Sequence, residues 1–176
     1  NWSDVNARET FARTSLIVPW RAGDPEREEV WDWARRYWQV HFPEFELLEV
    51  DSGEEPFSRG GSRNMGAEMA VGEILVFADA DTLVGHVEAA VANAKAGDWV
   101  IAYPEGMYYA LTKEATQKLI ASDPADGLYE PAKTSTRAQI TSFSGVLAMP
   151  REAFDTVGGY DQRMVAYGYE DNAIMF

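Results

Sequence analysis

Five apolar runs of strand length alternate along this chain with segments of helical periodicity. The runs are Ser15–Trp20, Phe45–Val50, Ile74–Ala78, Trp99–Tyr103 and Gly145–Met149. This alternation predicts an α/β fold with a mostly parallel central sheet that is covered by helices on both faces. No run is long enough to cross a bilayer. Because the 176 residues contain no repeat and no linker, we expect residues 1–176 to form a single domain.

Helix signals fill most of the intervals between these runs. Asp24-Pro25 is typical of a helix start, because an N-cap aspartate precedes a proline at the first helical position. The periodicity predicts a first helix through Trp38, followed by helices over Arg63–Val71 (closed by Gly72), Val87–Ala96, Lys113–Ala121 and Arg151–Val157. The rest of the Pro104–Ile140 segment has the composition of a loop, and we expect it to be a mobile acceptor loop or lid.

Charge and cysteine content narrow the classes of ligand. The net charge of −14 argues against nucleic acid as a partner, because a phosphate backbone would be repelled over most of the surface. The chain has no cysteine, which excludes disulfides and thiolate metal sites. Together with the absence of a membrane-spanning run, this leads us to expect a cytoplasmic location. An acidic protein that binds a diphosphate needs a bound cation or a cluster of arginines.

Asp79-Ala80-Asp81 follows an apolar strand directly, so that two carboxylates alternate across one residue at the strand's end. Such oxygen ligands suit Mg²⁺ or Mn²⁺, which keep waters and substrate phosphates in their remaining coordination positions. Taken alone, this triplet is more typical of a solvated acidic turn than of a metal site. A calcium-binding EF-hand loop is excluded, because Leu83 and Val84 occupy the positions that would require an oxygen ligand and a glycine.

The residues before this triplet carry a family resemblance. Ser62-Arg63-Asn64-Met65-Gly66, then Ala70 to Asp81, resembles the core of the GT-A glycosyltransferases, in which an Arg-Asn-x-Gly helix leads through a glycine turn into a strand and the Asp-x-Asp motif. Val50-Asp51-Ser52-Gly53 resembles the family's Val-Asp-Asp-Gly turn. The resemblance implies the GT-A fold, a Rossmann-like fold that binds nucleotide-diphospho-sugars.

The second half is similar to the β-1,4-galactosyltransferases. Phe143–Met149, Gly158–Asp161 and Tyr167–Asp171 stand where that family has Phe-Gly-Gly-Val, Asn-Gly-Phe and Gly-Trp-Gly-Gly-Glu-Asp-Asp-Asp. In the first half, Pro19-Trp20-Arg21 and Phe57-Ser58-Arg59 stand for the family's Pro-Phe-Arg and Phe-Asn-Arg. The chain departs from the pattern at Tyr167, Tyr169 and Asn172, which alters the acceptor side of the implied site.

The resemblance implies a role for each matched position. Asp81, with Asp79, would bind Mn²⁺ or Mg²⁺, and Asp51 would contact the uracil of a UDP-sugar donor. Asp171 would be the general base on an acceptor hydroxyl, with Glu170 beside it. The residues implied in substrate binding are Pro19, Trp20, Arg21, Asp51, Arg59, Arg63, Asp79, Gly145 and Tyr167.

The implied reaction is transfer of a sugar, galactose or N-acetylgalactosamine by preference, from UDP to a carbohydrate or other hydroxyl acceptor with inversion. Two alternatives stay open. The related polypeptide N-acetylgalactosaminyltransferases, which are retaining, share this half-motif, and a chain that binds a nucleotide sugar without turnover would also fit. The family's last metal ligand is a histidine beyond the acidic motif, and we expect it either to be missing or to lie on a segment beyond Phe176. His41 is expected to pack or cap, and His86 has no counterpart in the motif.

Overall fold

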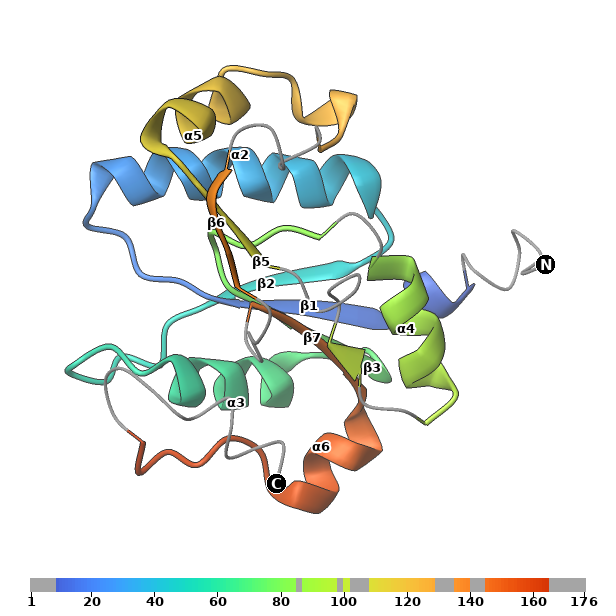
Figure 1. Ribbon diagram of the computed structural model, residues 1–176. Helices are drawn as coiled ribbons and strands as arrows, with labels where there is room; N and C mark the ends of the chain where they lie inside the picture. Colours follow the sequence, from blue (N-terminus) through green and yellow to red (C-terminus); the bar gives the residue numbers. More distant parts are fainter. Residues whose placement is uncertain are drawn as a thin grey trace.

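The computed structural model describes residues 9–84, 87–97, 100–101, 108–128, 135–139 and 145–164. A five-stranded sheet in the order β2-β1-β3-β7-β4 forms its centre (Figure 1). The strands are β1 (Thr14–Pro19), β2 (Glu46–Val50), β3 (Ile74–Ala78), β4 (Val100–Ile101) and β7 (Val146–Pro150). β1 pairs in parallel with β2 and β3, whereas β7 runs antiparallel to both β3 and β4. The sheet is therefore mostly parallel, and the α/β prediction is confirmed.

Both faces of the sheet are covered by helices because side chains alternate along each strand. Leu16 and Val76 pack with the aromatic stripe of α2 and with α4, whereas Ile17 and Phe77 pack with α3 and α6 on the opposite face. Figure 1 shows α2 and α3 on either side of the strands. The helices are α2 (Pro25–His41), α3 (Arg59–Met69), α4 (Val87–Lys95), α5 (Lys113–Ile120) and α6 (Arg151–Val157).

α3 begins and ends earlier than the sequence pattern predicts. Ser58 is its N-cap and accepts a hydrogen bond from the amide of Gly61 at 3.0 Å. The helix ends at Met69, so Gly72 does not close it. Gly72 instead lies against the backbone of β1, where an added Cβ would come within 2.7 Å of the Ser15 amide nitrogen. Position 72 requires glycine because two backbones approach closely there.

Part of the segment expected to be loop is a β-ladder. β5 (Tyr108–Leu111) and β6 (Ser135–Gln139) pair antiparallel as a second, two-stranded sheet. The prediction of loop is wrong for these residues, since strands of four and five residues without clear alternation give little local signal. Within the described residues, no helix is long and apolar enough to cross a membrane.

Candidate active site

The carboxyl ends of β2, β1 and β3 meet at one edge of the sheet, where ligands bind in open α/β folds. Arg21 follows β1, Asp51 follows β2, and Asp79 follows β3. β7 begins at this same edge because it runs antiparallel to β3, and the Gly145 carbonyl accepts a hydrogen bond from the Asp79 amide at 2.8 Å. Arg21, Asp51 and Asp79 therefore lie at the same edge of the sheet.

Arg21 and Asp51 form a bidentate ion pair across the ends of β1 and β2. Arg21 Nε and Nη2 donate to the two Asp51 oxygens at 2.7 and 2.8 Å, and Arg21 Nη1 donates to Glu55 at 2.7 Å. The guanidinium also lies over the Phe57 ring, with its carbon 5.1 Å from the ring centroid. The hydrogen bonds from Arg21, followed by one from the Gly53 amide, lower the pKa of Asp51. Asp51 is thus an ionised acceptor that remains partly open to solvent.

Arg63 and Arg59 of α3 hold Asp79. Arg63 Nη2 donates to Asp79 Oδ1 at 2.8 Å, and Arg59 Nη1 lies 4.0 Å from Asp79 Oδ2. The Arg63 side chain is only 2% exposed, and its guanidinium carbon lies 4.9 Å from the centre of the Tyr160 ring. Arg63 is therefore not a surface residue of its helix. From this buried position Arg63 holds Asp79, the first carboxylate of the Asp79-Ala80-Asp81 triplet, in place.

The glycine turn after α6 is anchored to α3 beside this ion pair. Asn64 exchanges two hydrogen bonds with the backbone of Tyr160, at 2.9 and 2.8 Å. Gly158 and Gly159 have φ angles of +79° and +76°, a conformation that glycine adopts without steric cost. An added Cβ on Gly159 would lie 2.7 Å from Asn64 Oδ1, so the close approach also requires glycine. The motif residue Asn64 thus joins two halves of the fold.

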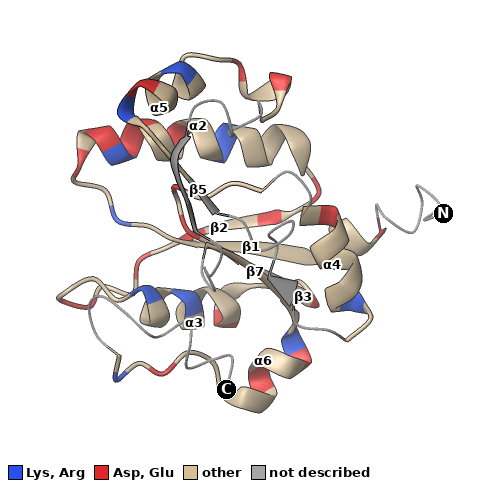
Figure 2. Ribbon diagram, viewed as in Figure 1, with Lys and Arg blue, Asp and Glu red and all other residues tan. Residues whose placement is uncertain are grey.

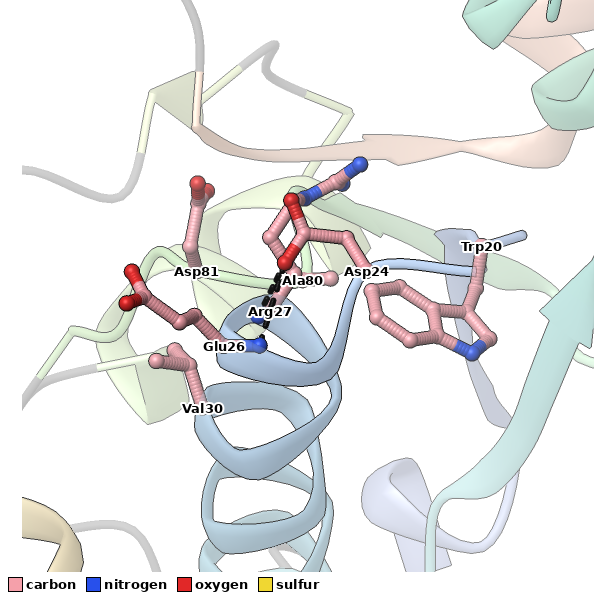
Figure 3. A pocket seen from close by; sticks show the side chains of 7 residues that line it. All are labelled: Trp20, Asp24, Glu26, Arg27, Val30, Ala80 and Asp81. Atoms are coloured by element: carbon pink, nitrogen blue, oxygen red, sulfur yellow. Dashed lines mark hydrogen bonds between the residues drawn. The ribbon is translucent and has the colours of Figure 1, made fainter. Parts of the chain in front are cut away.

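Asp81 lines a pocket of about 220 Å³ between the end of β3 and the first turn of α2. Figure 3 shows Asp81 together with the side chains at the start of α2 that line this pocket with it. Loss of solvation, followed by repulsion from Asp79, raises the pKa of Asp81, while the positive charges of Arg27 and Arg59 oppose that rise. No hydrogen bond or ion pair from another side chain reaches Asp81 within the part of the chain that the structure describes.

Four residues of this pocket were not predicted from the sequence. They lie at the start of α2 and are Asp24, Glu26, Arg27 and Val30. Asp24 caps the helix by accepting from the amides of Glu26 and Arg27 at 3.0 and 3.2 Å, and Figure 3 marks both bonds. One sequence signal could have found Arg27. It is a cation in the first turn of a helix, where the helix dipole favours acidic residues.

The remaining predicted positions have mixed outcomes. Pro19 is the last residue of β1 and is buried, while Trp20 is half-buried and lines the pocket. Tyr167, Glu170 and Asp171 lie outside the described residues. His41 contacts the Pro124 carbonyl at 2.8 Å and the Tyr37 ring, which confirms its packing role. His86 also lies outside the described residues, and among those described no three His, Cys, Asp or Glu side chains converge on a metal position.

The chain is similar to glycosyltransferases both in sequence and in fold. A family model described as "Glycosyltransferase like family 2" matches residues 44–176. The catalytic domain of Drosophila β1,4-galactosyltransferase 7, solved with xylobiose, is similar in fold, with a TM-score of 0.52 at 16% identity. That match covers 90% of this chain and 57% of the galactosyltransferase chain, so the chain spans just over half of its length.

A second solved structure is less similar. The mannosyltransferase PcManGT of Pyrobaculum calidifontis, in complex with GDP-Man and Mn²⁺, has a TM-score of 0.45 at 20% identity. That match covers 92% of this chain and 50% of the mannosyltransferase chain. Among proteins with curated functions, none matches this sequence.

Proposed function

The chain belongs to the glycosyltransferase like family 2 and has the GT-A fold, and from this we propose that it transfers a sugar from a UDP-sugar to an acceptor hydroxyl with a divalent cation. The observation that carries the proposal is the unequal setting of its two motif carboxylates. Asp79 is held by arginines, whereas Asp81 is directed into a pocket without a side-chain partner among the described residues. One carboxylate is fixed and the other is available to a ligand.

The residues of this pocket fit a hard cation. Asp81 forms no ion pair with an arginine among the described residues. Its raised pKa means that the negative charge is disfavoured at this position, and a bound cation would offset that effect. Asp81 would hold Mn²⁺ or Mg²⁺, with Asp79 next to it, and waters and phosphate oxygens would complete the shell. The cation, when bound, supplies positive charge that stabilises the leaving diphosphate.

The ends of β1 and β2 would hold the nucleotide. Asp51 would accept the imide N–H of uracil, a donor that cytosine lacks. Pro19, Trp20 and Arg21 would form the wall beside it, and Gly145 would allow a close approach from β7. Arg59 would contact phosphate, and Arg63 would keep Asp79 oriented toward the ribose or the donor sugar.

We assign the proton transfer to the acidic motif near the end of the chain. Asp171 would take the proton from the acceptor hydroxyl as it attacks the anomeric carbon, and the configuration would invert. Glu170 and Tyr167 would hold hydroxyl groups of the acceptor or donor. Galactose or N-acetylgalactosamine is the sugar we favour.

A donor screen tests this function directly. Release of the nucleoside diphosphate is followed with UDP-galactose, UDP-N-acetylgalactosamine, UDP-glucose and GDP-mannose, with Mn²⁺ or chelator, and with or without sugar acceptors including xylobiose. We expect release with a UDP-sugar only when Mn²⁺ is present, and its loss in Asp81→Ala. Asp32→Asn, which removes a carboxylate from the exposed side of α2, is the matched control and should behave as wild type. Equal rates with chelator and with Mn²⁺ would refute the metal assignment.

A further inference from the structure

Arg27 lines the same pocket as Asp81, yet the motifs give it no role. It belongs to the first turn of α2, with Glu26 and Glu28 on either side. Its charge acts on Asp81, which lies across the pocket on the loop after β3 (Figure 3). A cation in the first turn opposes the helix dipole, so helix stability does not explain why an arginine is present.

Arg27 also differs from the other arginines in its partners. Within the described residues its guanidinium forms no hydrogen bond and no ion pair, although the chain has 29 acidic residues against 15 basic ones. The other arginines with described side chains contact an acidic or carbonyl partner: Arg13 with Glu73, Arg21 with Asp51, Arg35 and Arg36 with Asp32, Arg59 and Arg63 with Asp79, Arg151 with three carbonyls, and Arg163 with Asp161.

One contact does hold the Arg27 side chain in place. Its guanidinium carbon lies 5.4 Å from the centre of the Trp20 ring. Trp20 is in turn packed against Trp31, with ring centroids 5.9 Å apart. Stacking uses the flat face of a guanidinium and leaves its N–H edge available, and that edge fits the paired oxygens of a phosphate. Arg27 therefore contacts an aromatic ring, while its hydrogen-bond donors have no partner among the described residues.

We propose that Arg27 binds the diphosphate of the nucleotide-sugar donor, on the side of the pocket opposite Asp81. The inference rests on the proposed function and names a phosphate contact that the motifs do not supply. A diphosphate between Asp81 and Arg27 would contact the cation held by Asp81 on one side and the Arg27 guanidinium on the other. In this acidic protein, two sources of positive charge would then offset the charge of the leaving UDP.

Binding measurements on Arg27→Gln test the proposal. Calorimetry with Mn²⁺ compares UDP, uridine and inorganic pyrophosphate on wild type, Arg27→Gln, Arg27→Lys and Arg36→Gln. Arg36 is the matched control, since it lies on the exposed side of the same helix and its removal changes the net charge equally. We expect Arg27→Gln to weaken UDP and pyrophosphate about ten- to a hundredfold while uridine binding changes less than about twofold, because only phosphate contacts are lost. Arg27→Lys should recover part of the loss.

The melting temperature separates binding from structure. Because Arg27 opposes the helix dipole, Arg27→Gln should melt at the wild-type temperature or above it, whereas a structural role would lower it. Wild-type UDP affinity in Arg27→Gln, or an equal loss for UDP and uridine, would overturn the inference and leave the proposed function standing. A wild-type protein that binds no UDP with Mn²⁺ would overturn both.

Discussion

The Asp51 carboxylate has three of its acceptor positions in use. Oδ1 accepts from the Gly53 amide and from Arg21, each at 2.8 Å, and Oδ2 accepts from Arg21 at 2.7 Å. An ionised carboxylate offers about four such positions, so one remains for a further donor. Asp51 can thus keep its partner Arg21 and still accept the imide N–H of uracil.

From this we predict that Asp51→Ala lowers affinity for UDP by roughly ten- to a hundredfold, the cost of one hydrogen bond to a charged group. CDP provides the internal control, because cytosine has no imide N–H and should respond only to a general disturbance of Arg21. Calorimetry of UDP, CDP and GDP on both proteins measures the effect. GDP bound as tightly as UDP, or equal losses for UDP and CDP, would contradict the uracil contact.

For the general base, we predict that Asp171→Asn removes transfer while UDP affinity stays near the wild-type value. Asparagine keeps the size of the side chain but cannot accept the proton, and a positioned base contributes on the order of 10²–10⁴-fold in rate. Steady-state turnover and UDP calorimetry, on a protein that includes any residues following Phe176, make the comparison. Turnover within a few-fold of wild type, or a product with the anomeric configuration of the donor, would favour the retaining alternative.

At the scale of elements, the contact between α3 and β1 depends on the absence of a side chain at Gly66. A Cβ there would collide with Ile17 Cγ2 of β1 and lie 3.2 Å from Val50 Cγ2. For Gly60, in the first turn of the same helix, the one described atom near an added Cβ is Tyr160 Cβ, at 3.4 Å. One glycine therefore sets the distance between helix and sheet, and the other does not.

We predict that Gly66→Ala destabilises the fold by about 1–3 kcal/mol, although alanine is the better helix former, because the core is overpacked. Gly60→Ala should change stability by less than about 1 kcal/mol. Urea unfolding of the two variants provides the comparison. Equal stability of both would mean that α3 can move away from β1 without cost.

α2 carries a buried tyrosine whose ionisation should weaken the fold at high pH. Burial, followed by the charge of Glu88, raises the pKa of Tyr37 to about 12. Since this lies above the unfolded value near 10, the neutral phenol is favoured in the folded state. Its contribution to stability is complete below pH 10 and is lost as the pH rises through about 12.

Wild type should therefore lose stability on the order of 2 kcal/mol more than Tyr37→Phe over this range. The difference in urea midpoint between the two proteins, measured at pH 7 and near pH 11.5, reports it. The Tyr37 hydroxyl donates one long hydrogen bond of 3.4 Å to the Val84 carbonyl, and its loss in Tyr37→Phe affects stability at both pH values. Comparing the two pH values therefore removes this constant contribution and leaves the effect of ionisation. Parallel declines of both proteins would show that Tyr37 titrates as if exposed.

For the whole molecule, the proposed ligand site is built from the ends of three adjacent strands of one sheet. We therefore predict one cooperative thermal transition, moved upward by UDP and Mn²⁺ together. Ligand at about 100 times its dissociation constant adds about 2.7 kcal/mol, or roughly 5–10 °C for a domain of this size. Calorimetric scans with UDP alone, Mn²⁺ alone and both together test this. Two separate transitions, or an equal shift with GDP and Mn²⁺, would contradict it.

Local pattern was sufficient to predict the strands β1, β2, β3 and β7 and the helices α2, α4, α5 and α6 to within a few residues. Buried strands are continuous apolar runs, and helix caps and stripes are short-range features of the chain. The edge at which Arg21, Asp51 and Asp79 meet also followed, because parallel strands end on the same side. The order β2-β1-β3 of these strands was not predicted and comes from the structure.

Pairing between distant segments required the tertiary structure. β7 antiparallel to β3, the β5–β6 ladder and the hydrogen bonds of Asn64 to Tyr160 join residues far apart in the chain, and no local preference encodes such a partner. The two motif aspartates look equivalent in sequence. Only the fold, which brings Arg63 into contact with Asp79, gives one carboxylate a fixed partner and leaves the other without a side-chain partner among the described residues. The physical reason is that charge pairing depends on distance in space, which sequence separation does not determine.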